Sequence, residues 1–138
     1  MLISCQRGDT TMKVFLACPV RNVTPEQKER IDAYVAELES RGIKVHYPPR
    51  DTNQDDPTGL SILRQNIGAI YESDEFHIFY DKTSEGSKFD IGAAFILNKR
   101  FKLANPEDVQ RTQSKSFENV LLLLNDGIMP LGIEGSPI

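Results

Sequence analysis

The chain has 138 residues, a net charge of −4 and 26% charged residues. This length suffices for one domain with its own core and is too short for two. The negative charge argues against general nucleic-acid binding, which needs a basic surface. No apolar run approaches the roughly 18 residues of a membrane-spanning helix. We therefore expect a globular cytoplasmic protein with no nucleic-acid or membrane partner.

Cysteine and histidine are too few for a metal centre or a disulfide framework. The chain has two of each, Cys5 and Cys18, and His46 and His77. Both histidines lie within apolar strand patterns, so we expect partly buried structural side chains there. The sequence therefore predicts reduced thiols and neither a metal nor another cofactor.

The two ends of the chain differ from its middle. Residues 1–11 show no periodicity and no signal-peptide pattern, and apolar residues recur only after Met12. The segment 127–138 holds three Gly and two Pro. We expect a disordered leader over 1–11, one α/β domain over 12–126, and an extended tail over 127–138.

The first half of the domain reads as strand, helix, strand. Residues 14–18 form an apolar run typical of a central strand. Thr24, Pro25 and Gln27 then give an N-cap, a first-position proline and a capping box. The helix they begin should end at Gly42. A second strand is expected over 43–47.

A polar loop over 48–57 precedes the second helix, which we expect over 59–73. Apolar residues recur there at helical spacing, which predicts a buried side made of Leu60, Leu63, Ile67 and Ile70. Asn66 lies at the edge of that stripe. The loop is either a binding loop or a mobile surface segment.

The stretch 76–95 organises the second half. It gives a buried strand over 76–80, a turn over 81–86, and a helix from Ser87 with Phe89, Gly92, Ala93 and Ile96 at helical spacing. A short strand over 100–103 and a helix over 117–124 follow. Such alternation predicts a single doubly wound parallel sheet, flavodoxin-like or Rossmann-like, with helices on both faces.

The turn before Ser87 is the first candidate for a site. In a parallel sheet it lies at the carboxyl ends of the strands, where open α/β folds bind ligands. Serine hydroxyls and backbone N–H groups at a helix start suit an anion such as phosphate. Asp90 lies in the helix beside this turn, which indicates chemistry on a sugar as well as anion binding.

The stretch Gly86-Ser87-Lys88-Phe89-Asp90-Ile91-Gly92 resembles a motif of the nucleoside 2-deoxyribosyltransferase superfamily, which includes 2'-deoxynucleoside 5'-monophosphate N-hydrolases. The resemblance extends over about 13–124. It implies that Asp90 stands at the position of the glutamate nucleophile that attacks the anomeric carbon. It also implies that Asn66 stands at the position of the family's second acid.

The resemblance assigns substrate contacts less specifically. It implies that Arg21, Ser84 and Ser87 hold a 5'-phosphate, with Gly86 in the same turn and Phe15 on the first strand. Gln54 matches a glutamine that contacts the base. Asn119 matches an asparagine that a neighbouring subunit lends to the site, so a homodimer or higher homo-oligomer is implied.

Each assignment has a plainer alternative. Asp90 could be a carboxylate favourable to its helix dipole, and Arg21 and Arg50 could be ordinary surface charges. Ser84 and Ser87 are common caps. Tyr47 and Tyr80 could line a pocket or pack in the core.

Two departures from the motif bear on activity. Asp90 is about 1.5 Å shorter in reach than glutamate, and Asn66 can only hydrogen-bond, whereas a carboxyl can also transfer a proton. The sequence therefore predicts an enzyme that cleaves or transfers at the N-glycosidic bond of a (deoxy)nucleoside or its 5'-monophosphate. The alternatives are a catalytically degenerate nucleotide-binding protein on the same fold and a structural domain without a small ligand.

Overall fold

The computed structural model describes residues 10–132. Strands and helices alternate along the chain, with one short helix and one 3-10 turn between them. The elements are β1 (Lys13–Ala17), α2 (Pro25–Ser40), β2 (Lys44–His46), α3 (Pro48–Asp51), α4 (Leu60–Glu72), β3 (Glu75–Ile78), α5 (Glu85–Ile96), β4 (Arg100–Leu103), η1 (Pro106–Asp108) and α6 (Phe117–Asn125).

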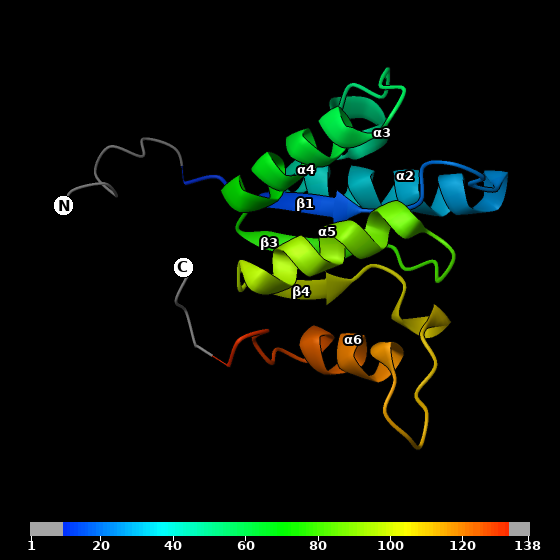
Figure 1. Cartoon of the computed structure of the whole chain (residues 1–138). Helices are drawn as coiled ribbons and strands as arrows, with labels where there is room; N and C mark the ends of the chain where they lie inside the picture. The colour runs from blue at the N-terminus through cyan, green and yellow to red at the C-terminus, as the bar shows by residue number, and fades with distance from the viewer. Residues whose placement is uncertain (1–9, 133–138) are drawn as a thin grey trace.

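The four strands form one parallel sheet in the order β2-β1-β3-β4. Helices α4 and α5 cross one face of this sheet, α2 lies behind it, and α6 runs beside β4 (Figure 1). The predicted parallel sheet with helices on both faces is confirmed. Among the described residues no helix has the length and apolar character needed to cross a membrane.

Local sequence signals fix the helix starts. Thr24 caps α2 by accepting a hydrogen bond from the Gln27 backbone N–H, and the Gln27 side chain accepts one from the Thr24 N–H. Ser84 caps α5 and Ser116 caps α6 in the same manner. Lys99 donates to the carbonyl groups of Tyr71 and Ser73, which closes the C-terminal end of α4.

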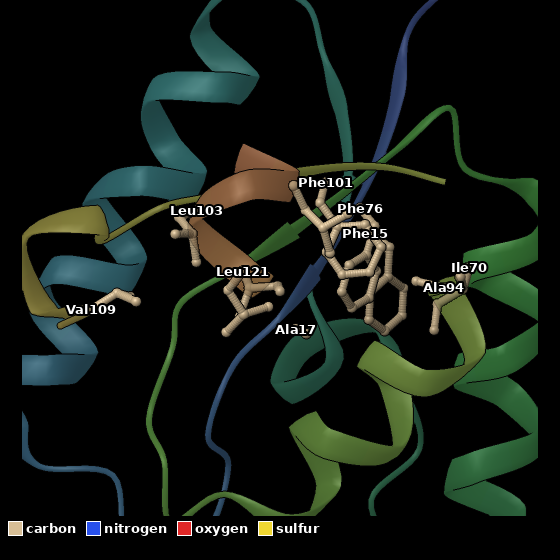
Figure 2. Close-up of a cluster of buried hydrophobic side chains, with 11 residues drawn as sticks. Phe15, Ala17, Ile70, Phe76, Ala94, Phe101, Leu103, Val109 and Leu121 are labelled. Carbon is tan, nitrogen blue, oxygen red and sulfur yellow. The ribbon is translucent and has the colours of Figure 1, made fainter. Parts of the chain in front are cut away.

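The larger core lies between the sheet and helices α4, α5 and α6. Phe15, Phe76 and Phe101 come from three adjacent strands and lie side by side in it, with ring centroids 5.8 and 4.9 Å apart (Figure 2). Ile70 of α4 and Ala94 of α5 pack against these rings. All five side chains are almost completely buried, so this core fixes α4 and α5 on the sheet.

The opposite face of the sheet packs on α2. Val14 and Leu16 of β1 meet Ile31 and Val35 of α2 there. His77 is buried on this face and joins the Tyr34 hydroxyl through Nδ1 and the Glu75 carboxylate through Nε2. Its structural role is as the sequence predicted.

The predicted buried side of α4 is correct at Ile70 and wrong at Leu60 and Ile67, and the apolar residues that recur along α5 are exposed as well. Leu60, Ile67, Phe89 and Ile96 are between 46% and 65% exposed. The buried residues are Asn66 and Ile70 on α4, and Ser87, Asp90 and Ala94 on α5. The apolar period alone therefore does not identify the buried side of either helix, because these sides also carry polar groups.

Three smaller differences concern boundaries. The loop expected over 48–57 begins with one helical turn, α3, whose first residue is Pro48 and whose Asp51 carboxylate accepts from the Tyr47 N–H. Helix α5 begins at Glu85, so Gly86 lies within the helix and not in the turn before it.

The described part of the expected tail is not extended. Residues 127–132 fold back in turns, and the Leu131 N–H donates to the Asn98 side chain. The remainder of the tail, 133–138, and residues 1–9 of the expected leader lie outside the described residues, as does Cys5.

Candidate active site

The order of the strands reverses at β1. The chain leaves β1 through α2 to reach β2 on one side, and it returns through α4 to β3 on the other side. Crevices of open α/β sheets form at the carboxyl ends of the strands that flank such a reversal. Helix α5 begins just after β3 and brings its first two turns to this edge (Figure 1).

Asp90 lies on the second turn of α5 with its side chain turned toward the sheet. The residue is 5% exposed, and burial raises the pKa of its carboxyl to about 7, against a hydrogen bond from Asn66 that lowers it. Its Oδ1 atom is buried and has no hydrogen-bond partner among the described residues. One carboxylate oxygen is thus held and the other is left without a donor, which is unusual for a buried carboxyl.

Asn66 lies at the centre of the buried side of α4. It is 6% exposed, and its Oδ1 accepts a hydrogen bond of 2.7 Å from the Thr52 hydroxyl. The Thr52 oxygen in turn lies 2.9 Å from Nε2 of His46 at the end of β2. The structure therefore joins the two predicted catalytic residues, and it adds two residues behind them.

The start of α5 holds two serine hydroxyls together, that of the N-cap Ser84 and that of Ser87 in the first helical turn. Ser84 donates to the Ser87 hydroxyl at 2.9 Å and accepts from the Ser87 backbone N–H. Ser87 is buried and Ser84 is half-buried. Gly86 is exposed, and a side chain built there would meet no atom within 4 Å. This turn therefore presents an open surface one helical turn before Asp90.

Arg21 and Gln54 lie in loops at the same edge of the sheet. Arg21 is exposed and follows β1, in a turn where Asn22 has a positive φ of 59°. The Gln54 side-chain N–H group donates to the carbonyl groups of Pro48 and Thr52, so its amide nitrogen is engaged by its own loop. A role for Gln54 in reading a base stays a prediction.

Phe15 and Asn119 have structural partners. Phe15 is fully buried, and its ring stacks on His46 with centroids 5.2 Å apart. The Asn119 amide accepts from the Thr112 N–H and donates to the carbonyl groups of Thr112 and Ser114, so it fixes the loop before α6. Their predicted contacts with substrate stay predictions.

The neighbouring titratable groups are poor substitutes for Asp90. Asp81 accepts hydrogen bonds from Thr83 and Gln27, and these bonds hold its pKa below the usual range. Cys18 directly follows β1, and burial raises its pKa to about 12, so it carries no charge at neutral pH. Asp90 is the carboxyl whose surroundings suit a reacting group.

Pattern reasoning did not single out Thr52 or Asn105. Thr52 directly follows α3, two residues before Gln54, and a single hydroxyl in a polar segment gives no pattern that would indicate its hydrogen bonds. Asn105 is completely buried and binds both the N–H and the carbonyl of Tyr80, which fixes the chain where it leaves β3. A single polar residue after a strand gives no signal of such a clamp.

Two hollows in the described surface are lined by residues other than Asn66, Ser87 and Asp90. One of about 570 Å³ runs along the outer sides of α4 and α5, between Ile67, Phe89 and Ile96. Another of about 510 Å³ follows the free edge of β2, where His46 forms part of its wall. Asp90 lines neither of them.

No protein-family model matches the chain, and a sequence search of characterised proteins finds no match. Solved structures do match. A CMP N-glycosidase of Clostridium botulinum, BcmB, is similar with a TM-score of 0.51 and 27% identity, over 66% of each chain. A 2-deoxyribosyltransferase of Bacillus psychrosaccharolyticus is similar with a TM-score of 0.57 and 21% identity, over 66% of this chain and 70% of that one.

The resemblance to the nucleoside 2-deoxyribosyltransferase superfamily is confirmed. The likeness spans 66% of the length of the N-glycosidase, so it covers part of that protein and not the whole of it. At 21% identity the likeness to the transferase shows the fold alone.

Proposed function

We propose that the protein is an enzyme that cleaves or transfers at the N-glycosidic bond of a (deoxy)nucleoside or its 5'-monophosphate, with Asp90 as nucleophile. One observation carries the proposal: Asp90 is a buried carboxyl at the sheet edge, held through one oxygen, with Oδ1 unpaired. The similar solved structures, an N-glycosidase and a 2-deoxyribosyltransferase, support this class of reaction.

The chemistry is a two-step displacement. The ionised Asp90 attacks C1' of the sugar, the C1'–N bond breaks, and its electron pair leaves with the base, which takes a proton from water. Water or a second base then attacks C1' of the ester and releases Asp90, as in retaining glycosidases. Asn66 cannot supply the proton, and it holds the carboxylate instead. The attacking form is the anion, so the rate rises as the pH passes through about 7.

A nucleoside 5'-monophosphate is the substrate that the turn at α5 favours. The hydroxyls of Ser84 and Ser87 at the start of α5 and the exposed guanidinium of Arg21 in the loop after β1 lie at one edge of the sheet. The similar N-glycosidase is described as acting on CMP. The proposed pose places the phosphate at this turn and C1' at Asp90.

Base release tests the proposal. The pure protein is incubated with a panel of nucleosides, deoxynucleosides and their 5'-monophosphates, and free base is measured by chromatography. We expect release from at least one monophosphate, and a loss of about 10³-fold or more in Asp90→Asn, which removes the charge and keeps the shape. The matched control is Asp81→Asn, which should stay active. Full activity of Asp90→Asn would show that the nucleophile lies elsewhere.

The phosphate contact has its own test. Arg21→Ala should weaken binding of a 5'-monophosphate about tenfold or more and leave the nucleoside nearly unchanged, because a charged hydrogen bond is lost. Calorimetric titration of both ligands checks this. Equal weakening of both would mean that Arg21 supports the fold.

A catalytically degenerate nucleotide-binding protein is the second candidate. The observation in its favour is Asn66, which replaces an acid with an amide beside a carboxyl of short reach. This candidate predicts that monophosphates raise the melting temperature while no base is released from any of them.

We also propose that the protein is a homo-oligomer, most simply a dimer. Two helical surfaces expose apolar side chains: the outer sides of α4 and α5, and α6 with Phe117 and Leu123. The contact through α6 that the sequence suggested, with Asn119 lent to a neighbour, and a cytoplasmic location both stay predictions.

A further inference from the structure

We infer that Thr52 and His46 are positioning residues that keep the Asn66 amide turned toward Asp90. The inference rests on the proposed function only for its kinetic consequence. Its geometric content is a line of side chains from separate elements, in which Thr52 from the loop after α3 lies 2.9 Å from His46 of β2 and 2.7 Å from Asn66 of α4. The line continues to Asp90 of α5, whose pKa the Asn66 hydrogen bond lowers against burial.

The direction of each bond follows from the donors available. The Asn66 Oδ1 can only accept, so the Thr52 hydroxyl gives it its single proton. The Thr52 oxygen can then only accept from His46, which must carry a proton on Nε2. With Oδ1 engaged, the Asn66 Nδ2 group faces Asp90 and donates to it. One arrangement therefore satisfies all three contacts.

Burial makes this arrangement costly to change. Thr52 and Asn66 are 4% and 6% exposed, so neither side chain can exchange its partner for water. If the amide turned over, its N–H group would face the Thr52 hydroxyl and its oxygen would face the Asp90 carboxylate, and two acceptors would meet in a buried place. Phe15 stacks parallel to the His46 ring and fixes the far end of the line.

The titratable and charged groups near these four side chains do not change which atoms donate and which accept. Cys18 faces Asp90 from the end of β1, and its pKa is raised to about 12, so it is neutral. Arg50 and Asp51 face His46 with opposite effects, and burial lowers the pKa of His46. His46 is therefore neutral at pH 7, with its proton on Nε2 where Thr52 needs it.

The orientation of the Asn66 amide affects the pKa of Asp90. The Asn66 hydrogen bond favours the ionised carboxylate against burial. Without the Thr52 hydroxyl, Asn66 is free to turn, and the carboxylate loses its fixed donor. Thr52 and His46 would thus increase the fraction of Asp90 able to attack at neutral pH, although neither touches the substrate.

Titration of the Asp90 carboxyl by carbon NMR tests this without any activity. Thr52→Val removes the hydroxyl, keeps the shape and suits the extended backbone of that residue, while Thr52→Ser is the matched control that keeps the hydroxyl. Asp90→Asn assigns the signal. We expect the midpoint of titration to rise by about one pH unit in Thr52→Val and to stay unchanged in Thr52→Ser. Equal midpoints in all three proteins would overturn the inference.

A second measurement uses the unaltered protein and therefore does not depend on whether Thr52→Val folds. Nitrogen NMR of His46 should show the neutral ring protonated on Nε2, and a proton on Nδ1 would contradict the line of bonds.

Base release provides the kinetic arm. A rise of one pH unit from about 7 leaves about a tenth of Asp90 ionised at pH 7, so kcat of Thr52→Val should fall about fivefold there with KM unchanged, and recover at pH 9. A loss of equal size at both pH values would indicate a merely structural role and count against the inference. If the unaltered protein releases no base at all, the proposed function fails while the NMR result still decides the inference.

Discussion

Helices α4 and α5 present opposite chemistry on their two sides. Toward the sheet edge they bury Asn66, Ser87 and Asp90, and toward solvent they expose Ile67 and Phe89 at 46% and 65%. An ordinary surface helix has the reverse arrangement, with its apolar stripe inward. Both helices are nevertheless firmly packed, because Ile70 and Ala94 anchor them on the phenylalanine core (Figure 2).

The contrast between the two sides shows that α4 and α5 have two unfavourable features, one on each side. A buried unpaired carboxyl oxygen destabilises the folded chain, and an exposed apolar stripe favours association. Globular proteins tolerate such features where function requires them. We interpret the inner side as the reaction site and the outer side as the contact with a second copy, and the following predictions test each side separately.

The largest expected effect is on stability and comes from the inner side. Between the ordinary pKa of 3.8 and the folded value of about 7, the unfolded chain ionises Asp90 while the folded chain keeps the proton. The stability due to this group is complete below pH 4 and is lost as the pH rises through 7. Asp90→Asn should therefore gain about 4 kcal/mol relative to the unaltered protein between pH 4 and pH 8.

Urea unfolding at both pH values measures this change. Any constant effect of the substitution, such as an unpaired amide nitrogen, cancels in the difference between the two pH values. The control is Asp81→Asn. The Asp81 carboxyl has a lowered pKa, so its ionised form stabilises the fold, and the variant should be less stable than the unaltered protein at pH 8. A pH-independent difference for Asp90→Asn would mean that Asp90 is not desolvated as the structure indicates.

The next effect concerns the outer side. Five large apolar side chains about half exposed there give roughly 100 Å² each, and two copies together reach about 1,000 Å², the lower bound of a specific interface. These side chains are Leu60, Ile67, Tyr71, Phe89 and Ile96. Phe89→Glu should weaken dimer association about 100-fold or more, because it places a charge in the centre of the contact.

Sedimentation equilibrium of two variants separates the candidate surfaces. Phe117 on α6 is 88% exposed, so Phe117→Glu makes the same change outside the α4–α5 surface. We expect Phe117→Glu to leave the association unchanged. If Phe117→Glu dissociates the protein and Phe89→Glu does not, the contact runs through α6, as the sequence suggested.

The sheet and most element positions could be predicted from the sequence because their signals are local. Short stretches with apolar residues define the strands, and Thr24 with Pro25 and Gln27 defines the start of α2. The strand over 100–103 agrees with the structure at both ends. The short helix α3 was missed, because a single turn of four residues has no periodicity.

The sides of α4 and α5 could not be predicted by the same reasoning. Periodicity assigns apolar residues to the core, and here Leu60, Ile67, Phe89 and Ile96 face solvent. The family motif singled out Asp90 and its register singled out Asn66, and the structure places these two side chains next to each other; their roles in a reaction stay predictions. The proposed positioning role of Thr52 and His46 could not be predicted, because hydrogen bonds between separate elements exist only in the folded chain.

The smallest effect tests what Asn66 contributes. Asn66→Asp keeps the bond from the Thr52 hydroxyl and places a second carboxyl beside Asp90. Two carboxyls in one buried place cannot both ionise, so they share one proton, and the pair can deliver it to the leaving base. We expect base release to increase at least tenfold. Asn66→Ala is the control, since it removes the hydrogen bond without adding an acid, and its rate should fall. Single-turnover assays measure both. If Asn66→Asp slows the reaction as much as Asn66→Ala does, the amide donor matters more to Asp90 than an acid would, and Asn66 is the residue on which this active site depends.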